Sequence, residues 1–182
     1  RSPAVGAWPN HYLSLFELTL RRPDADAFLL LQDDAIIYDG ENVREYLEES
    51  LWPAGGAPVV SLYCPEPYTA GRYGWHRLRR PWVWGAQAFV FSPEAARRYL
   101  RDRRVCQHRW RSAAGGLTQI DVLLGWWAWW RRVPIWLPTP SLIQHVGEVS
   151  TIWLDCQTVG PRAANLFVSD RGRVKRLFPP KS

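Results

Sequence analysis

The stretch Ala27-Phe28-Leu29-Leu30-Leu31-Gln32-Asp33-Asp34-Ala35 decides the fold. It begins with five apolar residues in a row and shows no alternation. This pattern predicts a short central strand that is covered on both faces, as in an α/β sheet. Two carboxylates follow the strand at once. Because ligands bind beyond the carboxyl ends of strands in open α/β sheets, Asp33 and Asp34 are candidate site residues. Taken alone, they are better explained as residues that cap a turn.

Helical and extended patterns alternate on both sides of this strand. Helical spacing predicts helices over residues 9–22, 42–51, 92–102 and 118–131. Ser92 followed by Pro93 is a typical start for the third of these helices. Further strands are predicted over residues 58–63, 84–91, 134–137 and 141–145, and aperiodic loops over residues 65–81 and 103–116. The alternation predicts the α/β class, with flanking helices on the sheet.

Composition is that of an ordinary folded domain. The chain has 182 residues, of which 47% are apolar and 22% charged, and this excludes a disordered protein. The longest nearly apolar stretch, residues 122–130, falls short of the ~20 residues that span a bilayer. We expect one domain over residues 1–150 and a C-terminal extension over residues 151–182 that ends in a basic tail.

Charge and cysteine content narrow the partners and the compartment. The formal net charge is +6 and only two of the 23 basic residues are lysines. Such a chain suits an anionic partner, although a coding bias toward arginine explains the count equally well. Nucleic acid is the least favoured partner because no nucleic-acid-binding motif is present. Three cysteines without a CxxC pair favour buried thiols in a cytoplasmic protein, with one disulfide as the alternative.

Tryptophan is unusually frequent, with 12 residues. Trp126, Trp127, Trp129 and Trp130 lie within five positions of a predicted helix, so they cannot all face the core. Some of them must meet a partner. The two interpretations are a homo-oligomer face and a membrane surface next to Arg131 and Arg132.

Four phrases of the chain resemble GT-A glycosyltransferases. Residues 28–34 look like the strand and DxD-type motif of that fold, and residues 84–92 look like its acceptor-side strand. Residues 119–124 and 140–147 are similar to the catalytic motif and the C-terminal signature of the N-acetylglucosaminyltransferase IV family, which branches N-glycans. The resemblance implies a GT-A-like, Rossmann-like mixed sheet and a metal-dependent, inverting glycosyltransferase. The donor would be a UDP-sugar such as UDP-N-acetylglucosamine, and the acceptor a glycan or another hydroxyl compound.

The resemblance also assigns roles to residues. Asp34 and His145 would hold Mn²⁺ or Mg²⁺, and Asp121 would be the general base that deprotonates the acceptor hydroxyl. The donor would contact the residues around these three and a loop that closes over the diphosphate: Gln32, Asp33, Gly85, Ala86, Gln87, Arg79, Arg80 and Trp82.

Two departures from the family pattern leave an alternative function open. Gln32 stands where the DxD-type motif starts with a carboxylate. The strand–helix–strand unit that binds the nucleoside in GT-A enzymes has no counterpart before Asp33, where only one helix is predicted. The alternative is therefore a non-catalytic GT-A-like module that binds glycan or membrane through a Trp-rich surface.

Overall fold

The structure of the protein is a computed structural model. It describes residues 7–38, 43–53, 55, 58–65, 73–81, 85–108, 120–145, 164 and 167. The helices in these ranges are α1 (Ala7–Arg21), α2 (Val43–Ser50), α3 (Pro93–Arg101), α4 (Arg103–Cys106) and α5 (Ile120–Arg131). The strands are β1 (Phe28–Leu31), β2 (Ala35–Ile37), β3 (Val59–Ser61), β4 (Gly74–Arg77), β5 (Ala88–Phe91), β6 (Ile135–Thr139) and β7 (Ile143–His145).

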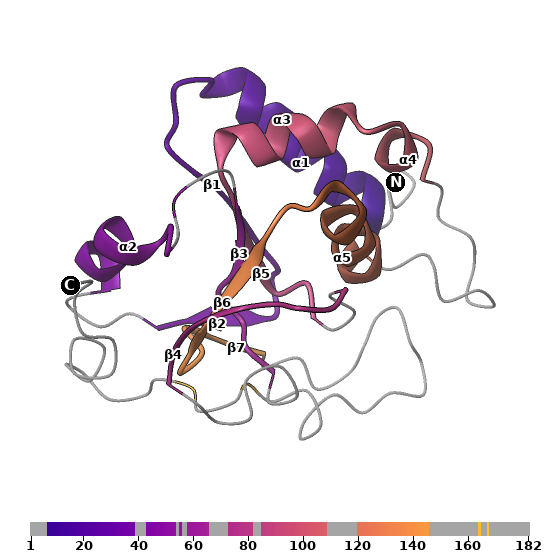
Figure 1. Ribbon diagram of the computed structural model, residues 1–182. Helices are drawn as coiled ribbons and strands as arrows, with labels where there is room; N and C mark the ends of the chain where they lie inside the picture. Colours follow the sequence, from indigo (N-terminus) through magenta and orange to yellow (C-terminus); the bar gives the residue numbers. More distant parts are fainter. Residues whose placement is uncertain are drawn as a thin grey trace.

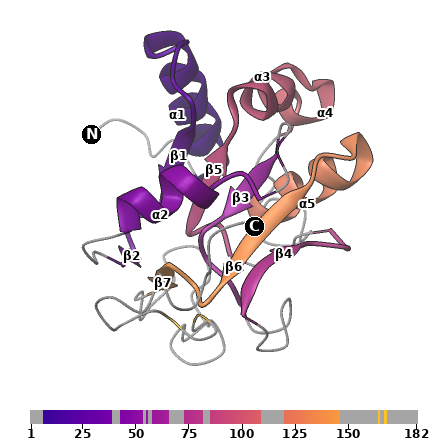
Figure 2. The same ribbon diagram turned by 60° about the vertical axis from the view of Figure 1, so that its left-hand side comes forward.

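Five strands form a mixed sheet in the order β1-β5-β3-β6-β4. Strands β3 and β6 run parallel, and the other neighbours run antiparallel. A second sheet consists of β2 and β7, which lie at the opposite end of the molecule from α3 and α4 in both views (Figures 1 and 2). The predicted α/β class, with a mixed sheet and flanking helices, is confirmed.

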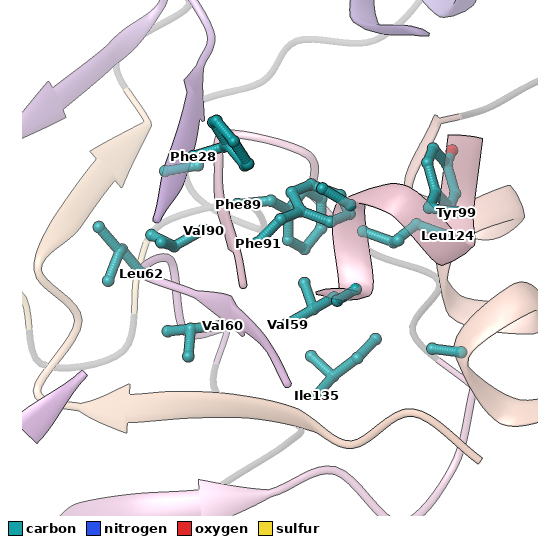
Figure 3. Packing of buried hydrophobic residues seen from close by; sticks show 14 of the residues in the cluster. Phe28, Val59, Val60, Leu62, Phe89, Val90, Phe91, Tyr99, Leu124 and Ile135 are labelled. Atoms are coloured by element: carbon teal, nitrogen blue, oxygen red, sulfur yellow. The ribbon is translucent and has the colours of Figure 1, made fainter. Parts of the chain in front are cut away.

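The core lies between the sheet and the helices α1, α3 and α5. Figure 3 shows Phe28, Phe89 and Phe91 from the sheet directed toward the same space as Tyr99 of α3 and Leu124 of α5. All five side chains are buried. Helix α3 begins where the sequence predicts, because Ser92 Oγ accepts the backbone N–H of Ala95 at 3.2 Å. This packing fixes α5 against the sheet and so positions Asp121 in its first turn.

The decisive strand differs from its prediction in one respect. Strand β1 is an edge strand of the sheet, and the central-strand prediction is wrong. The side chains of Leu29 and Leu31 are 43% and 47% exposed, so only one face of β1 is covered. The unalternating apolar run is misleading because an edge strand can carry leucines on an exposed face without losing its pairing.

Three short elements were not predicted: β2, β4 and α4. Strand β4 and helix α4 fall in the two stretches predicted to be loops, and β2 follows the acidic turn. Each has three or four residues, too few to show a period. Of the predicted C-terminal extension, only Ala164 and Phe167 are described. Ala164 pairs with Pro65 as an isolated bridge, and its N–H donates to Gln144 Oε1 at 2.8 Å.

Two of the three cysteines lie within the described residues. Neither Cys64 nor Cys106 forms a disulfide, as favoured. Cys64 is buried but Cys106 is exposed, which corrects the prediction of buried thiols for that residue; Cys156 lies outside the described residues. Within the part of the chain that is described, no helix has both the length and the apolarity to cross a bilayer.

His11 makes the stability of the fold depend on pH. Its ring lies against Phe91 and Tyr99, and burial lowers its pKa from 6.5 to about 4. The folded state therefore favours neutral His11, while the unfolded chain binds a proton below pH 6.5. The stability is complete above pH 6.5 and falls as the pH drops toward 4, by about 3 kcal/mol in total. The free energy of unfolding, measured with urea, should fall with decreasing pH less steeply in His11→Gln than in the wild type over this range. Parallel pH profiles would contradict the assignment to His11.

Candidate functional site

The candidate site centres on a contact between Asp34 and His145. His145 Nε2 lies 3.0 Å from Asp34 Oδ2, although the two residues are 111 positions apart in sequence. The His145 side chain is 4% exposed and that of Asp34 is 39% exposed. The pairing of β2 with β7 brings them together, because it places Ala35 opposite His145. Two of the residues predicted to hold a metal ion are therefore neighbours in space.

A buried hydroxyl fixes β7 in this place. Ser141 Oγ accepts the backbone N–H of Cys64 at 3.0 Å and lies 2.6 Å from the carbonyl oxygen of Ile143. It also lies 3.2 Å from the carbonyl oxygen of Leu62. Ser141 is completely buried. These bonds connect the chain after β3 to the start of β7, so Ser141 is a positioning residue for His145.

Asp121 is held at the start of α5 by two backbone N–H groups. Its Oδ2 accepts the N–H of Gly85 at 2.8 Å, and its Oδ1 accepts the N–H of Val122 at 2.9 Å. The side chain thus joins the first turn of α5 to the segment that precedes β5. Two of the phrases that resemble glycosyltransferases, residues 84–92 and 119–124, meet at this bond.

Gly85 has a conformation and an environment that few other residues tolerate. Its φ is +81°, in the region that favours glycine. A Cβ atom on Gly85 would lie 2.5 Å from Gln87 Oε1 and 2.7 Å from the Tyr63 ring. The residue is therefore enclosed by Gln87 and Tyr63, while its N–H holds Asp121.

The two parts of the site lie at the same end of the sheet. The N–H of Gln32 donates to the carbonyl oxygen of Gln87 at 2.9 Å and extends the β1–β5 ladder by one pair. Gln32 is two residues before Asp34, and Gln87 is two residues after Gly85. The segment that carries Asp34 is thus hydrogen-bonded to the segment that anchors Asp121. This end holds the carboxyl termini of β1, β3 and β6, as the position of the acidic residues in the sequence predicts.

Two acceptor atoms in this region are buried without a hydrogen-bond partner in the described part of the chain. They are Asp34 Oδ1 and Gln87 Oε1. An unpaired buried acceptor costs about 1–3 kcal/mol, and a bound ligand can recover that cost. Gln87 is only 6% exposed. Both atoms have the capacity to accept a hydrogen bond or to coordinate a cation.

The remaining predicted residues differ in how closely the structure associates them with this centre. Ala86 is half-buried and packs against the core, and Asp33 is exposed beside Asp34. Arg79 is exposed as well. Arg80 lines a shallow pocket with Gly125, Ala128 and Trp129 of α5, so it lies along that helix beyond the turn that carries Asp121. Trp82 lies outside the described residues.

Two residues that support the site were not predicted. Ser141 forms part of the phrase that contains His145, but nothing in the sequence distinguishes a buried hydroxyl hub from an exposed serine. Tyr63 is 2% exposed and packs beside Gly85. Nothing in the sequence around Gly85 and Gln87 indicates that Tyr63 packs beside them.

The fold and the site define a class: a mixed α/β protein with a carboxylate–histidine pair and a second, anchored carboxylate at one end of its sheet. In comparisons with known proteins, no family model matches the sequence, and no curated protein matches it.

Gly85 provides a direct test of this geometry. Gly85→Ala should destabilise the protein by about 3 kcal/mol, since strain at positive φ adds to overpacking against Gln87 and Tyr63. Gly55→Ala is the matched control. Gly55 also has a positive φ, +66°, but open space lies around the added Cβ, so it should cost about 1 kcal/mol. Chemical denaturation measures both variants. Equal losses would show that the contacts around Gly85 are not close.

Proposed function

We propose that the protein is a metal-dependent glycosyltransferase that transfers a sugar from a UDP-sugar to a hydroxyl acceptor with inversion. The observation that carries this proposal is the Asp34–His145 contact at 3.0 Å. The proposed GT-A-like character of the fold rests on the resemblance of four phrases, and all four supply residues to the candidate site: Asp34, Gly85, Asp121 and His145. N-acetylglucosamine is the sugar that the resemblance favours.

The residues present fit a divalent cation. Asp34 Oδ1 is buried without a partner among the described residues, and His145 Nε2 lies beside the other carboxylate oxygen. No set of three or more His, Cys, Asp or Glu side chains with metal-binding geometry occurs in the described ranges. Mg²⁺ commonly binds through one or two protein carboxylates and completes its shell with water and substrate phosphates, so two protein ligands suit a diphosphate-dependent site. When bound, Mg²⁺ or Mn²⁺ would stabilise the negative charge of the departing diphosphate.

Asp121 has the chemistry of the proposed base. An ionised carboxylate offers about four acceptor positions, and the N–H groups of Gly85 and Val122 occupy two of them. These two bonds also fix its orientation. The acceptor oxygen would form a bond to the anomeric carbon while its proton passes to Asp121. The bond from the anomeric carbon to the diphosphate oxygen breaks, and its electron pair leaves with UDP. One displacement by an acceptor on the face opposite the leaving group inverts the anomeric centre.

Donor recognition is proposed for the residues between these two carboxylates. Gln87 directs a buried, unpaired acceptor oxygen toward Gly85, which suits an N–H or O–H group of a sugar. Gln32 replaces the first carboxylate of the DxD-type motif and lowers the negative charge near the metal. Arg79, Arg80 and the neighbouring Trp82 are proposed to contact the diphosphate through charge-assisted hydrogen bonds or ring contacts when the donor is bound.

Metal and donor together should raise the melting temperature of the wild type. Mn²⁺ with UDP-N-acetylglucosamine should give a larger shift than either alone, and EDTA should remove it, because binding to the folded state stabilises it. Asp34→Asn and His145→Gln should abolish the joint shift. Asp26→Asn is the matched control: it removes the same charge from an exposed residue at the other end of β1 and should retain the shift.

A screen of several nucleotide sugars with Mn²⁺, Mg²⁺ or EDTA completes the test by measuring donor hydrolysis and thermal shift. Absence of any shift with every donor would contradict the enzyme proposal and favour a non-catalytic binding module. A shift that persists in Asp34→Asn would remove Asp34 from the site.

Asp121→Asn separates the base from the binding groups. The amide cannot accept the proton, so transfer should fall by at least roughly 100-fold while donor binding remains. The amide oxygen can still accept the N–H of Gly85, which preserves the anchor of α5. Transfer kinetics and thermal shift measure the two effects separately. Loss of donor-induced stabilisation would instead assign Asp121 a structural or binding role.

A further inference from the structure

Most of the net charge of the chain is concentrated near one end of α5. Residues 93–104 and 129–132 contain seven arginines and two carboxylates, a balance of +5 compared with +6 for the whole chain. All seven arginines are exposed: Arg97, Arg98, Arg101, Arg103, Arg104, Arg131 and Arg132. In Figure 1 the end of α5 that leads into β6 lies next to α3 and α4, so the two stretches form one surface. We call it the basic end of α5.

Two tryptophans in the last turn of α5 are exposed. Trp129 and Trp130 are 51% and 49% exposed, whereas Trp127 is 2% exposed in the core. This confirms that the four tryptophans of the cluster do not all face the core. Trp126 stacks on Trp130, with ring centroids 5.5 Å apart. The pair Trp129–Trp130 therefore presents large apolar rings among arginines.

Side-chain contacts hold this surface in a defined arrangement. Arg131 Nε donates to Asp102 Oδ2 at 2.6 Å, and Arg98 donates to the carbonyl oxygen of Arg131 at 3.1 Å. The guanidinium of Arg104 lies 4.4 Å from the centroid of the Trp130 ring. The Asp102 side chain is almost completely buried, and its carboxylate is paired with Arg131. Asp102 thus fixes the position of Arg131 and offsets its charge.

We propose that the basic end of α5 docks on an anionic phospholipid surface. Tryptophan is the residue that prefers the membrane–water interface, where its ring meets acyl chains and its N–H meets headgroups. Each arginine near an anionic leaflet adds about 1 kcal/mol of attraction. A shallow pocket beside Trp129, lined by Leu78, Ala128 and Ile135, adds apolar surface. Nucleic acid is less well matched, because the two rings extend from a helix end rather than lining a groove that follows a strand.

This docking leaves the candidate site accessible. Asp121 lies in the first turn of α5, and Trp129 and Trp130 lie in its last turn. A helix of 12 residues is about 18 Å long. Asp121 would therefore lie about one helix length from the lipid, and substitutions of Trp129, Trp130, Arg103 and Arg132 should not change donor binding.

Co-sedimentation with vesicles tests the proposal on the full chain. We expect binding to vesicles of equal parts phosphatidylcholine and phosphatidylglycerol, weak binding to phosphatidylcholine alone, and a loss of binding as salt rises. Trp129→Ser with Trp130→Ser should weaken binding roughly tenfold. Arg103→Glu with Arg132→Glu should weaken it roughly twentyfold or more.

Matched controls keep the result specific. Leu13→Ser with Leu20→Ser removes apolar side chains that are 53% and 65% exposed on α1, and Arg22→Glu with Arg44→Glu makes the same change of charge elsewhere. The apolar control should bind as the wild type does, and the charge control should lose less than Arg103→Glu with Arg132→Glu. Circular dichroism verifies folding of every variant. Equal losses in test and control variants, or no binding to anionic vesicles at low salt, would overturn the proposal. Tighter binding to a single-stranded oligonucleotide than to vesicles, abolished by the tryptophan substitutions, would reassign the surface to nucleic acid.

Discussion

The candidate site depends on one buried hydroxyl, that of Ser141. A serine hydroxyl can donate one proton and accept two, and here it satisfies the N–H of Cys64 while it lies beside two carbonyl oxygens. The N–H of Leu142 donates to the carbonyl oxygen of Leu62, and the N–H of Tyr38 donates to that of Leu142. This line of hydrogen bonds runs from the end of β3 through β7 to β2. The contact between Asp34 and His145 is a consequence, because β7 can oppose β2 only where these bonds hold it.

The edge position of β1 gives the pair its asymmetry. Asp34 follows an edge strand and keeps more than a third of its side chain in solvent, whereas His145 follows a line of buried residues and is almost covered. A fixed, buried imidazole with a neighbouring carboxylate that solvent can reach is an arrangement open to a ligand. A central strand, as the apolar run of residues 27–31 predicted, would have buried both groups and favoured a closed, structural pair.

Sequence patterns predicted the long elements well and the short ones poorly, for physical reasons. The helices α1, α3 and α5 extend over at least two turns, so their apolar period is visible, and Ser92 marks a cap. Strand β2 has three residues and β4 has four, too few for a period, and pairing with distant strands defines them. Resemblance assigned roles to the candidate residues Asp34, His145 and Asp121, while Ser141 and Tyr63 were missed because their contacts join segments far apart in sequence. Trp82 lies outside the described residues, so its role in donor binding stays a prediction from the sequence.

Helix α5 connects the two proposals and explains an odd feature of its sequence. Its first turn needs a carboxylate that meets Gly85, and its middle needs Leu124, Trp127 and Ala128 in the core. Its last turn has no such constraint, because Trp129 and Trp130 are 51% and 49% exposed, with Arg104 of α4 over the Trp130 ring. An ordinary helix would present polar residues to solvent at that point. Exposing two tryptophan rings to water is unfavourable unless another surface covers them. The two arginines that follow favour an anionic surface. The site and the docking surface are thus separated along one rigid element.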